Sequence, residues 1–397
     1  MTTIYFRTDG NSDIATGHLM RCLTIARACT QAARSKDENV QITFLVSDSQ
    51  SRSLLEDRFE MSGEFSIHSL NNNYRRLEDE VPYLLSYMTD KSSTGRELSK
   101  AAAHAKPWLF VDSYFATPGY FRMLSGSCKI AYLDDLRNFD CPVNLLINYD
   151  TDLDCPHYAE ASHKLLGAQY TPLRAQFQSP SYNVRPQAAH VLLSTGGTDP
   201  YGLAEHLLHT IYDTDYPDRK PDNTDTGSVS NWDTERLQSL HYHVVTSRAN
   251  TRYNDLHAFA VKNSHIHIHE NVSDMASLMA SCDMAVSAGG TTLSELCAVG
   301  VPTISYLMAE NQRTAVDNFA AKEIIPCAGD IRASLPQNKD NQIGTSPLSS
   351  DAVISHILRF MTNMSENMKL RQKSSHKMRA FLDGCGAGRI ADALLSL

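Results

Sequence analysis

The amino-terminal segment Ile4–Cys22 is the part of the sequence that most restricts how this chain can fold. It begins with the short apolar run Ile4-Tyr5-Phe6, which is typical of a buried strand, and continues into a loop rich in Gly, Asn, Ser and Thr. Apolar residues then recur at helical spacing, which predicts a helix from about His18 to Ala33. A strand, a polar loop and an amphipathic helix in this order predict a unit of a parallel sheet whose faces are covered by helices.

The same order of elements recurs along the chain and predicts an α/β protein. Further apolar runs alternate with helix-prone segments in the first half, at 42–46, 108–111, 130–133 and 145–147. The second half opens in the same way, with an apolar run at 191–194 followed by a Gly-rich loop and a helix from about 202 to 212. Both halves are therefore expected to contain a parallel sheet.

Two domains are expected, because 397 residues exceed what one hydrophobic core usually serves. The stretch between Arg174 and His190 is rich in Gln, Ser, Pro and Asn and lacks a long apolar run, which is typical of a linker. We therefore predict an amino-terminal domain over 1–178 and a carboxyl-terminal domain over 187–397. Residues 213–235 contain few apolar side chains and are predicted to form a loosely ordered insertion.

Composition narrows the possible partners. The net charge is −9 and Lys and Arg are scattered, which argues against nucleic acid or an anionic membrane as the main partner. The nine cysteines include no Cys-x-x-Cys pair, so neither a disulfide scaffold nor a thiolate zinc site is expected. No apolar run approaches the length of a membrane span and no signal peptide precedes the first strand, so a soluble, cytoplasmic protein is expected.

Polar residues follow three of the predicted strands in the first half. Asp112, Asp134 with Asp135, and Asn148 each stand where an apolar run ends. Ligands of open α/β sheets bind outside the carboxyl ends of the strands, so these side chains are expected near one crevice, although each is also an ordinary turn residue. His18 is expected on the first turn of its helix, where an imidazole exchanges protons near neutral pH. A surface or helix-capping histidine is the alternative.

Two Gly-containing turns in the second half each stand between a predicted strand and a helix. Gly196-Gly197 follow one apolar run, and Gly289-Gly290 with Thr291 follow another. Glycines let a ligand approach the backbone closely, and the free N–H groups at a helix start attract a diphosphate. Glu295, one turn along the second helix, is placed to accept hydrogen bonds from a ribose diol. The alternative is a capping box formed by a Thr at the helix start and Glu295.

Two patterns permit a metal site, but a simpler structural interpretation is favoured for each. The run Asp150–Asp154 alternates carboxylates that could chelate Mg²⁺, yet it follows a strand end, where Asp serves as a turn residue. The run His265–His269 alternates His and Ile, which places its three imidazoles on one face of a strand. Successive side chains on that face are about 7 Å apart and splay outward, so a zinc site is not expected.

The amino-terminal motif resembles a known enzyme family. Phe6-Arg7-Thr8-Asp9 followed by Gly17-His18-Leu19-Met20-Arg21-Cys22-Leu23 is similar to the amino terminus of the UDP-sugar hydrolases of pseudaminic acid biosynthesis, which release a 2,4-diacetamido-2,4,6-trideoxy-L-altrose from UDP. Further segments that resemble this family are Val111–Tyr114, Leu133–Asp135, Leu145–Asn148, Leu173-Arg174 and Gly196–Asp199. The stretch Met284–Tyr306, with Asn311 and Gln312, also resembles the nucleotide-sugar signature of GT-B-type glycosyltransferases, including the one that makes lipid II.

The resemblance implies a GT-B-type fold with two Rossmann-like domains facing a cleft. It implies hydrolysis, with inversion, of a UDP-linked 2,4-diacetamido-2,4,6-trideoxy hexose at the anomeric carbon. UDP and the free sugar for nonulosonic (pseudaminic) acid synthesis would be the products, and no metal or other cofactor is implied. His18 is implied as the base that activates water. The implied substrate-binding residues are Asp9, Gly17, Arg21, Tyr114, Asn148, Arg174, Gly196, Gly197, Ser287, Gly290, Thr291, Glu295, Asn311 and Gln312.

Two other functions fit the same residues. The alternative is a GT-B-type glycosyltransferase of cell-surface polysaccharide synthesis, in which His18 deprotonates an acceptor hydroxyl instead of water. The first half shows no apolar or basic patch for a membrane-bound acceptor, which favours hydrolysis. A nucleotide-sugar sensor without catalysis would have no use for the His, Arg and Tyr around the crevice. The turn Gly289–Thr292 departs from the serine-rich turn of some family members, which leaves the sugar configuration open.

Overall fold

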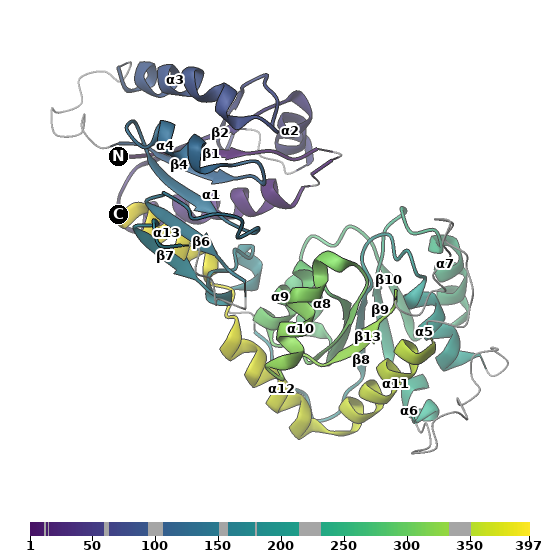
Figure 1. Cartoon of the computed structure of the whole chain (residues 1–397). Helices are drawn as coiled ribbons and strands as arrows, with labels where there is room; N and C mark the ends of the chain where they lie inside the picture. Colours follow the sequence, from purple (N-terminus) through teal and green to yellow (C-terminus); the bar gives the residue numbers. More distant parts are fainter. Residues whose placement is uncertain are drawn as a thin grey trace. The chain divides into compact units, whose positions relative to one another are not determined.

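The computed structural model describes the whole chain apart from residues 12, 15, 59–62, 94–105, 151–157, 179–180, 214–231 and 333–350. The chain forms two compact units. Unit 1 comprises Met1–Ala175 and Cys385–Leu397, and unit 2 comprises Gln176–Gly384. Each unit contains a parallel sheet with helices on its faces, so the predicted α/β class with two Rossmann-like domains is confirmed (Figure 1).

Within its described residues, unit 1 is built around a seven-stranded sheet with the strand order β3-β2-β1-β4-β5-β6-β7. All neighbouring strands run parallel. The strands are β1 (Thr2–Thr8), β2 (Val40–Val46), β3 (Ser66–Ser69), β4 (Trp108–Asp112), β5 (Lys129–Leu133), β6 (Leu145–Asn148) and β7 (His163–Leu166). The helices are α1 (Gly17–Ser35), α2 (Ser49–Ser53), α3 (Val81–Ser93), α4 (Pro118–Leu124) and α13 (Gly386–Ser396).

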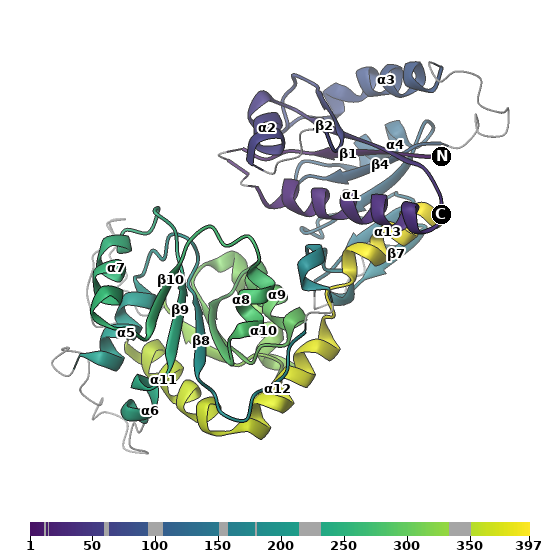
Figure 2. The same ribbon diagram turned by 180° about the vertical axis from the view of Figure 1, so that it is seen from behind.

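Helices cover both faces of this sheet because its central strands carry apolar side chains on both sides. On one face, Leu23 of α1 and Ile390 of α13 pack in a cluster with Phe6 of β1. On the other face, Leu84 of α3 and Phe121 of α4 belong to a second cluster. Figure 2 shows α1 and α13 side by side on the first of these faces.

The last helix belongs to unit 1, not to the carboxyl-terminal domain in which the prediction of 187–397 places it. Ile390, Ala391 and Leu394 of α13 are buried in the same cluster as α1. Burying an aliphatic side chain of the size of Ile or Leu stabilises a fold by about 1.5–3 kcal/mol, so this packing is the physical reason for the difference. The other boundary, between Ala175 and Gln176, falls just before the predicted domain end at 178.

Unit 2 contains, within its described residues, a six-stranded parallel sheet with the order β10-β9-β8-β11-β12-β13. The strands are β8 (His190–Ser194), β9 (His241–Val245), β10 (Ile266–His269), β11 (Met284–Ala288), β12 (Thr303–Leu307) and β13 (Cys327–Asp330). The helices are α5 (Leu203–Tyr212), α6 (Thr234–Gln238), α7 (Tyr253–Lys262), α8 (Met275–Ser281), α9 (Thr291–Val299), α10 (Arg313–Ala321), α11 (Asp351–Glu366) and α12 (Met368–Phe381). Most of the insertion predicted at 213–235 lies outside the described residues, and α6 begins within its last part.

The strand order of both sheets reverses at one point. In unit 1 the chain passes outward from β1 to β3 and then returns to the other side of β1 to form β4. In unit 2, β8 and β11 have the same relation. Loops that follow such a pair of strands leave in opposite directions and open a ligand crevice at the carboxyl ends. A binding site is therefore expected after β1 and β4 in unit 1, and after β8 and β11 in unit 2.

Histidines from three strands share one face of the unit 2 sheet. The ring nitrogens of His190 and His243 are 3.0 Å apart, those of His243 and His269 are 2.9 Å apart, and those of His241 and His267 are 3.1 Å apart. Such contacts are hydrogen bonds in which one imidazole donates and the other accepts. Among the described residues, no group of three or more His, Cys, Asp or Glu side chains is arranged to hold a metal ion. The carboxylates predicted between Thr151 and Asp154 lie outside the described residues.

This histidine face predicts that unit 2 loses stability in mild acid. Burial lowers the pKa of His243 to about 4, and four neighbouring imidazoles contribute to this lowering. The unfolded chain binds a proton near pH 6.5, so stability is complete above about pH 6.5 and is lost as the pH falls toward about 4. After allowance for solvent screening, we expect a loss on the order of 1–2 kcal/mol between pH 7 and pH 4.5, measured by urea denaturation.

A His243→Gln variant should flatten this pH dependence, because glutamine keeps a polar side chain but binds no proton. His163→Gln is the matched control, since His163 lies exposed on β7 of unit 1. If both variants retain the native slope of stability against pH, the histidine face does not control acid stability.

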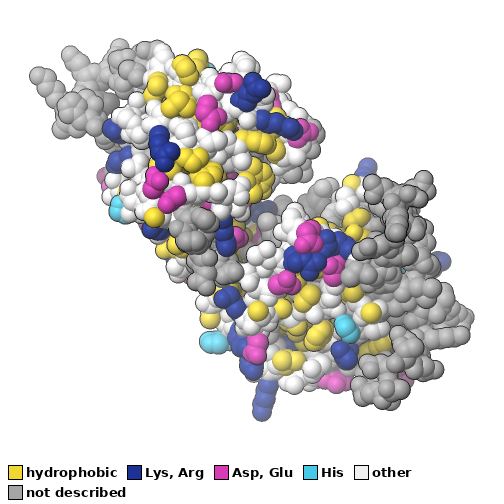
Figure 3. All heavy atoms as spheres, viewed as in Figure 1, with side chains coloured by type: hydrophobic (Ala, Val, Ile, Leu, Met, Phe, Trp, Pro, Cys, Tyr) yellow, Lys and Arg dark blue, Asp and Glu magenta, His cyan; other side chains and the backbone are white. Residues whose placement is uncertain are grey.

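None of the described helices combines the length and apolarity that a membrane span requires. On the face shown in Figure 3, the described acidic and basic side chains are interspersed with hydrophobic ones.

Candidate active site

His18 and Asp112 meet at the point in unit 1 where the strand order reverses. His18 lies on the first turn of α1, which follows β1, and Asp112 is the last residue of the adjacent strand β4. The Nδ1 atom of His18 lies 2.5 Å from Oδ1 of Asp112, and both side chains are at most 6% exposed. The sequence placed both residues at the crevice but did not predict that they pair.

This contact fixes the tautomer of His18. An ionised carboxylate only accepts hydrogen bonds, so Nδ1 must carry the proton and donate it to Asp112. The lone pair is then on Nε2, which has no hydrogen-bond partner among the described residues. Burial would raise the pKa of Asp112, but the charges of Arg21 and His18 outweigh burial and hold this pKa well below its ordinary value. Asp112 is therefore a permanent acceptor that orients the imidazole.

A small pocket with a volume of about 10 Å³ lies beside His18. The ring of Tyr114 stands edge-on to the imidazole, with ring centroids 4.4 Å apart and planes at 81°. Tyr114 is 45% exposed, so its other side is open to a ligand. The pocket is lined by Asp9, Ile14, His18, Tyr74, Asp112, Ser113, Tyr114 and Phe115.

Arg21 is predicted to bind substrate, but in the structure its guanidinium group contacts other side chains of unit 1. Its Nε and Nη2 atoms each donate to one oxygen of Asp112 at 2.5 Å. Its Nη1 atom donates to the hydroxyl of Tyr149 at 2.6 Å, and Nη2 also lies 2.7 Å from Asp135. The side chain is 14% exposed. All three guanidinium nitrogens thus have partners, so Arg21 organises the site instead of presenting its charge to a ligand.

Two further residues proposed for substrate binding are also held internally. One carboxylate oxygen of Asp9 accepts from Arg7 at 2.5 Å, and the other accepts from the backbone N–H of Ser47 at 2.6 Å. Asn148 donates to the hydroxyl of Tyr158 at 2.7 Å and accepts from the N–H of Asp150 at 2.8 Å. Both side chains are buried, so they shape the edge of the sheet. Gly17 is the first residue of α1, and Arg174 lies near the end of unit 1.

The loop after β8 positions Gly196 and Gly197 at the carboxyl edge of the unit 2 sheet. Gly196 has a φ of +82°, which an L side chain rarely adopts, and both glycines are exposed. The start of the following helix is already occupied, because the carboxylate of Asp199 accepts from the N–H groups of Leu203 and Ala204, each at 3.0 Å. The backbone of this loop is exposed, but the carboxylate of Asp199 already binds the N–H groups at the start of α5.

The loop after β11 differs, because no side chain caps α9. Its N-cap residue is Gly290, and the predicted capping box of Thr and Glu295 is not formed. Position 289 has no room for a side chain, because a Cβ added to Gly289 would lie 2.2 Å from Cγ2 of Val316. Gly290 has open space around it, because a Cβ added there would meet no atom within 4 Å. The N–H of Leu293 donates to the carbonyl of Gly290 at 3.0 Å, but the N–H groups of Thr291 and Thr292 have no acceptor among the described residues and are available to an anion.

The remaining predicted residues surround this helix start or lie beneath it. Thr291 is exposed at the first position of α9, and Glu295 lies half-buried one turn later. Asn311 is exposed, whereas Gln312 accepts from the N–H of Met308 at 3.1 Å. Ser287 is fully buried in β11, and its hydroxyl donates to the carbonyl of Ala288 at 3.1 Å. Ser287 therefore supports the loop and does not face a ligand.

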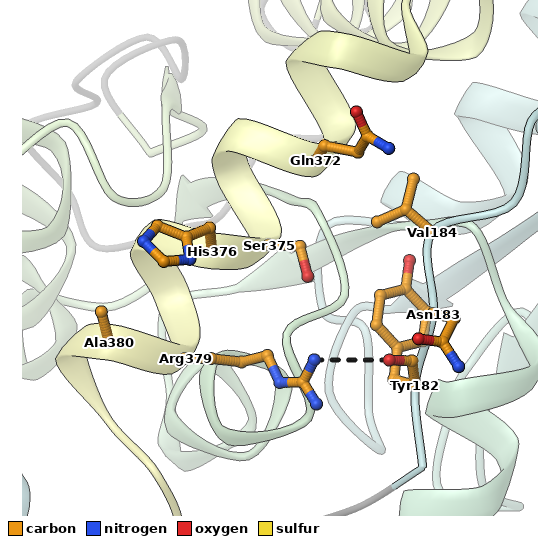
Figure 4. Close-up of a pocket in the computed structure, with 8 residues that line it drawn as sticks. All are labelled: Tyr182, Asn183, Val184, Gln372, Ser375, His376, Arg379 and Ala380. Atoms are coloured by element: carbon orange, nitrogen blue, oxygen red, sulfur yellow. Dashed lines mark hydrogen bonds between the residues drawn. The ribbon is translucent and has the colours of Figure 1, made fainter.

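A larger hollow in unit 2, of about 510 Å³, lies elsewhere. It is formed between the extended segment 182–184 and α12, where Arg379 donates to the carbonyl of Tyr182 at 3.3 Å (Figure 4). None of the residues predicted for the site lines it. It is also on the segment that leads into β8, away from the carboxyl ends of the strands.

Comparison with known proteins gives limited sequence similarity. No protein-family model matches the chain. It is 23% identical over 326 residues to an uncharacterized protein of Methanocaldococcus jannaschii, covering 79% of this chain and 57% of that protein. It is 27% identical over 156 residues to the spore coat polysaccharide biosynthesis protein SpsG of Bacillus subtilis, covering 39% of this chain and 40% of that protein. The alignments thus span about half the length of these curated relatives.

Solved structures resemble the whole chain. MurG of Acinetobacter baumannii has a TM-score of 0.60 at 12% identity, with full coverage of both chains. Arabidopsis thaliana UGT89C1, complexed with UDP, has a TM-score of 0.53 at 11% identity, covering 99% of this chain and 100% of that one. The pneumococcal O-GlcNAc transferase GtfA, in complex with UDP and GlcNAc, has a TM-score of 0.51 at 10% identity, covering 100% of this chain and 99% of that one. The chain therefore has the two-domain α/β fold of the GT-B glycosyltransferases.

Proposed function

We propose that this protein is a glycosyltransferase that uses a UDP-activated sugar in polysaccharide synthesis. The observation that carries the proposal is the pair of His18 and Asp112, which leaves the lone pair of Nε2 directed away from the carboxylate at the ligand edge of unit 1. Two structures of similar fold, UGT89C1 and GtfA, were solved with UDP, which supports the donor class, and the similarity to a spore coat polysaccharide biosynthesis protein supports the pathway class.

In this proposal each unit has one task. Unit 2 binds the diphosphate at the uncapped start of α9, where backbone N–H groups stabilise the charge that develops as UDP leaves. Unit 1 supplies His18, whose Nε2 takes the proton of the acceptor hydroxyl while the oxygen attacks the anomeric carbon. The bond from that carbon to UDP breaks, and UDP leaves with the electron pair. Because UDP is a good leaving group, no acid residue is required.

Hydrolysis is the second candidate, and the size of the pocket beside His18 favours it. A volume of about 10 Å³ is close to what one water molecule needs. The motif Gly17–Leu23 resembles hydrolases that release a 2,4-diacetamido-2,4,6-trideoxy hexose from UDP for pseudaminic acid synthesis. In that reaction water replaces the acceptor hydroxyl, and His18 serves as the same base.

UDP release from a nucleotide sugar separates the two candidates. The protein is incubated with UDP-N-acetylglucosamine, with and without added free monosaccharides, and the released UDP is measured. For the transferase we expect release to rise at least tenfold with an accepted sugar. UDP release that is clearly above background and equal with and without sugars indicates hydrolysis, and the absence of UDP binding in calorimetry contradicts both. A chelator should leave the rate unchanged, because base and anion stabilisation are assigned to His18 and α9.

A further inference from the structure

A positive charge beside His18 opposes the role of this residue as a base. The Nη2 atom of Arg21 lies 3.0 Å from Nδ1 of His18. A neighbouring cation disfavours proton uptake by an imidazole. Asp112 carries one negative charge, and its Oδ1 atom contacts both His18 and Arg21. If Asp112 were the only carboxylate, the protonated imidazole and Arg21 would leave one uncompensated positive charge in a buried site.

Asp135 is placed to supply the missing charge. It follows β5, the strand next to β4, and its Oδ2 atom lies 2.7 Å from Nη2 of Arg21. Its side chain is 26% exposed, whereas Asp112 is fully buried. Burial raises the pKa of Asp135 above its ordinary value, and the charge of Arg21 opposes this rise. With Asp135 ionised, the two positive charges of Arg21 and protonated His18 are matched by the two negative charges of Asp112 and Asp135.

The other ionisable groups around this cluster do not supply that charge. Burial raises the pKa values of Tyr114, Tyr149 and the Cys22 thiol, so these groups are neutral near pH 7. Asp9 pairs with Arg7, which also contacts Glu80, in a separate buried network. Asp134 accepts from the N–H groups of Leu136 and Arg137 and from the hydroxyl of Tyr158, so its carboxylate is used in its own loop.

We propose that Asp135 is a positioning residue that provides the second negative charge His18 needs in order to accept a proton next to Arg21. The inference rests on the proposed function, in which His18 is the base. Asp135 acts through Arg21 and needs no contact with substrate. Before the reaction, Arg21, Asp112 and Asp135 together carry one net negative charge. Proton transfer to His18 makes the cluster neutral, so the negative charge of Asp135 stabilises the protonated imidazole.

The test is the proton titration of His18 in the full-length protein, followed by NMR of labelled histidine and assigned with His18→Gln. Asp135→Asn should lower the titration midpoint by about one pH unit, which is a tenfold change in proton affinity. Asp135→Glu should restore most of the native midpoint. Glu160→Gln is the control, because it removes a carboxylate from an exposed ion pair with Arg122 and should not move the midpoint.

The proposal is overturned if Asp135→Asn, with a native-like NMR spectrum, titrates within about 0.3 unit of the native protein. It is also overturned if Glu160→Gln shifts the midpoint as far as Asp135→Asn. The measurement needs no turnover, so failure of the proposed function is recognised separately, as a native protein that releases no UDP from any nucleotide sugar.

Discussion

Replacing His18 by alanine should lower kcat for UDP release about 10³-fold while leaving the affinity for UDP unchanged. A positioned general base contributes roughly 10²–10⁴-fold to a rate, and His18 is the residue assigned this role at the pocket in unit 1. The diphosphate is assigned to α9 in unit 2, so removal of the imidazole does not touch its binding. Released UDP in a coupled assay gives kcat, and calorimetry with UDP alone gives the affinity.

The control for this change is His163→Ala, which removes an exposed imidazole from the same unit. Its kcat should equal that of the native protein. Asp112→Asn should reduce kcat as well, because an amide no longer selects the tautomer that leaves Nε2 unprotonated. A His18→Ala variant that retains a tenth or more of the native kcat contradicts the assignment of His18 as the base.

A matched pair of glycine variants should separate folding from binding in unit 2. Gly289→Ala forces a Cβ to 2.2 Å from Cγ2 of Val316 and to 3.2 Å from Cβ of Gln312. Overpacking of this kind destabilises by about 1–3 kcal/mol, so we expect a clear drop in the urea midpoint of unit 2. Gly290→Ala meets no atom within 4 Å and has a φ of −141°, so its stability should equal that of the native protein.

Gly290→Ala, which should leave stability unchanged, should instead affect the binding of UDP. A methyl group at Gly290 stands at the exposed start of α9, where the diphosphate must approach the backbone. We therefore expect Gly290→Ala to weaken UDP binding at least tenfold in calorimetry without a change in stability. Native affinity in this variant would mean that the diphosphate binds elsewhere in unit 2.

Periodicity and strand-end polarity predict much of this fold and part of the site. Local patterns identify β1, α1, β8 and the turn before α9, because apolar spacing and glycine are local signals. The placement of α13 in unit 1 was not predicted, since its partner α1 is more than 350 residues away in the sequence and an amphipathic helix does not specify what it packs against.

The roles of individual polar residues were harder to predict. Arg21, Asp9 and Asn148 stand at the right edge of the sheet, but each is satisfied by neighbouring side chains or backbone groups. A buried polar group needs a hydrogen-bond partner whether or not a ligand is present, so its position alone does not distinguish the two cases. The difference between α5, capped by Asp199, and α9, which has no side-chain cap, likewise becomes visible only in the hydrogen bonds.

The return of α13 to unit 1 has a consequence for biosynthesis. The ribosome makes the sheet of unit 1 first, but the helix that completes one of its apolar faces is the last described element to emerge. Until then, Leu23, Ala26 and their neighbours lack part of their cover, while unit 2 already has its whole sequence. Unit 2 is thus inserted in the sequence of unit 1, and the unit that carries His18 receives α13 only after the whole of unit 2 has been synthesised.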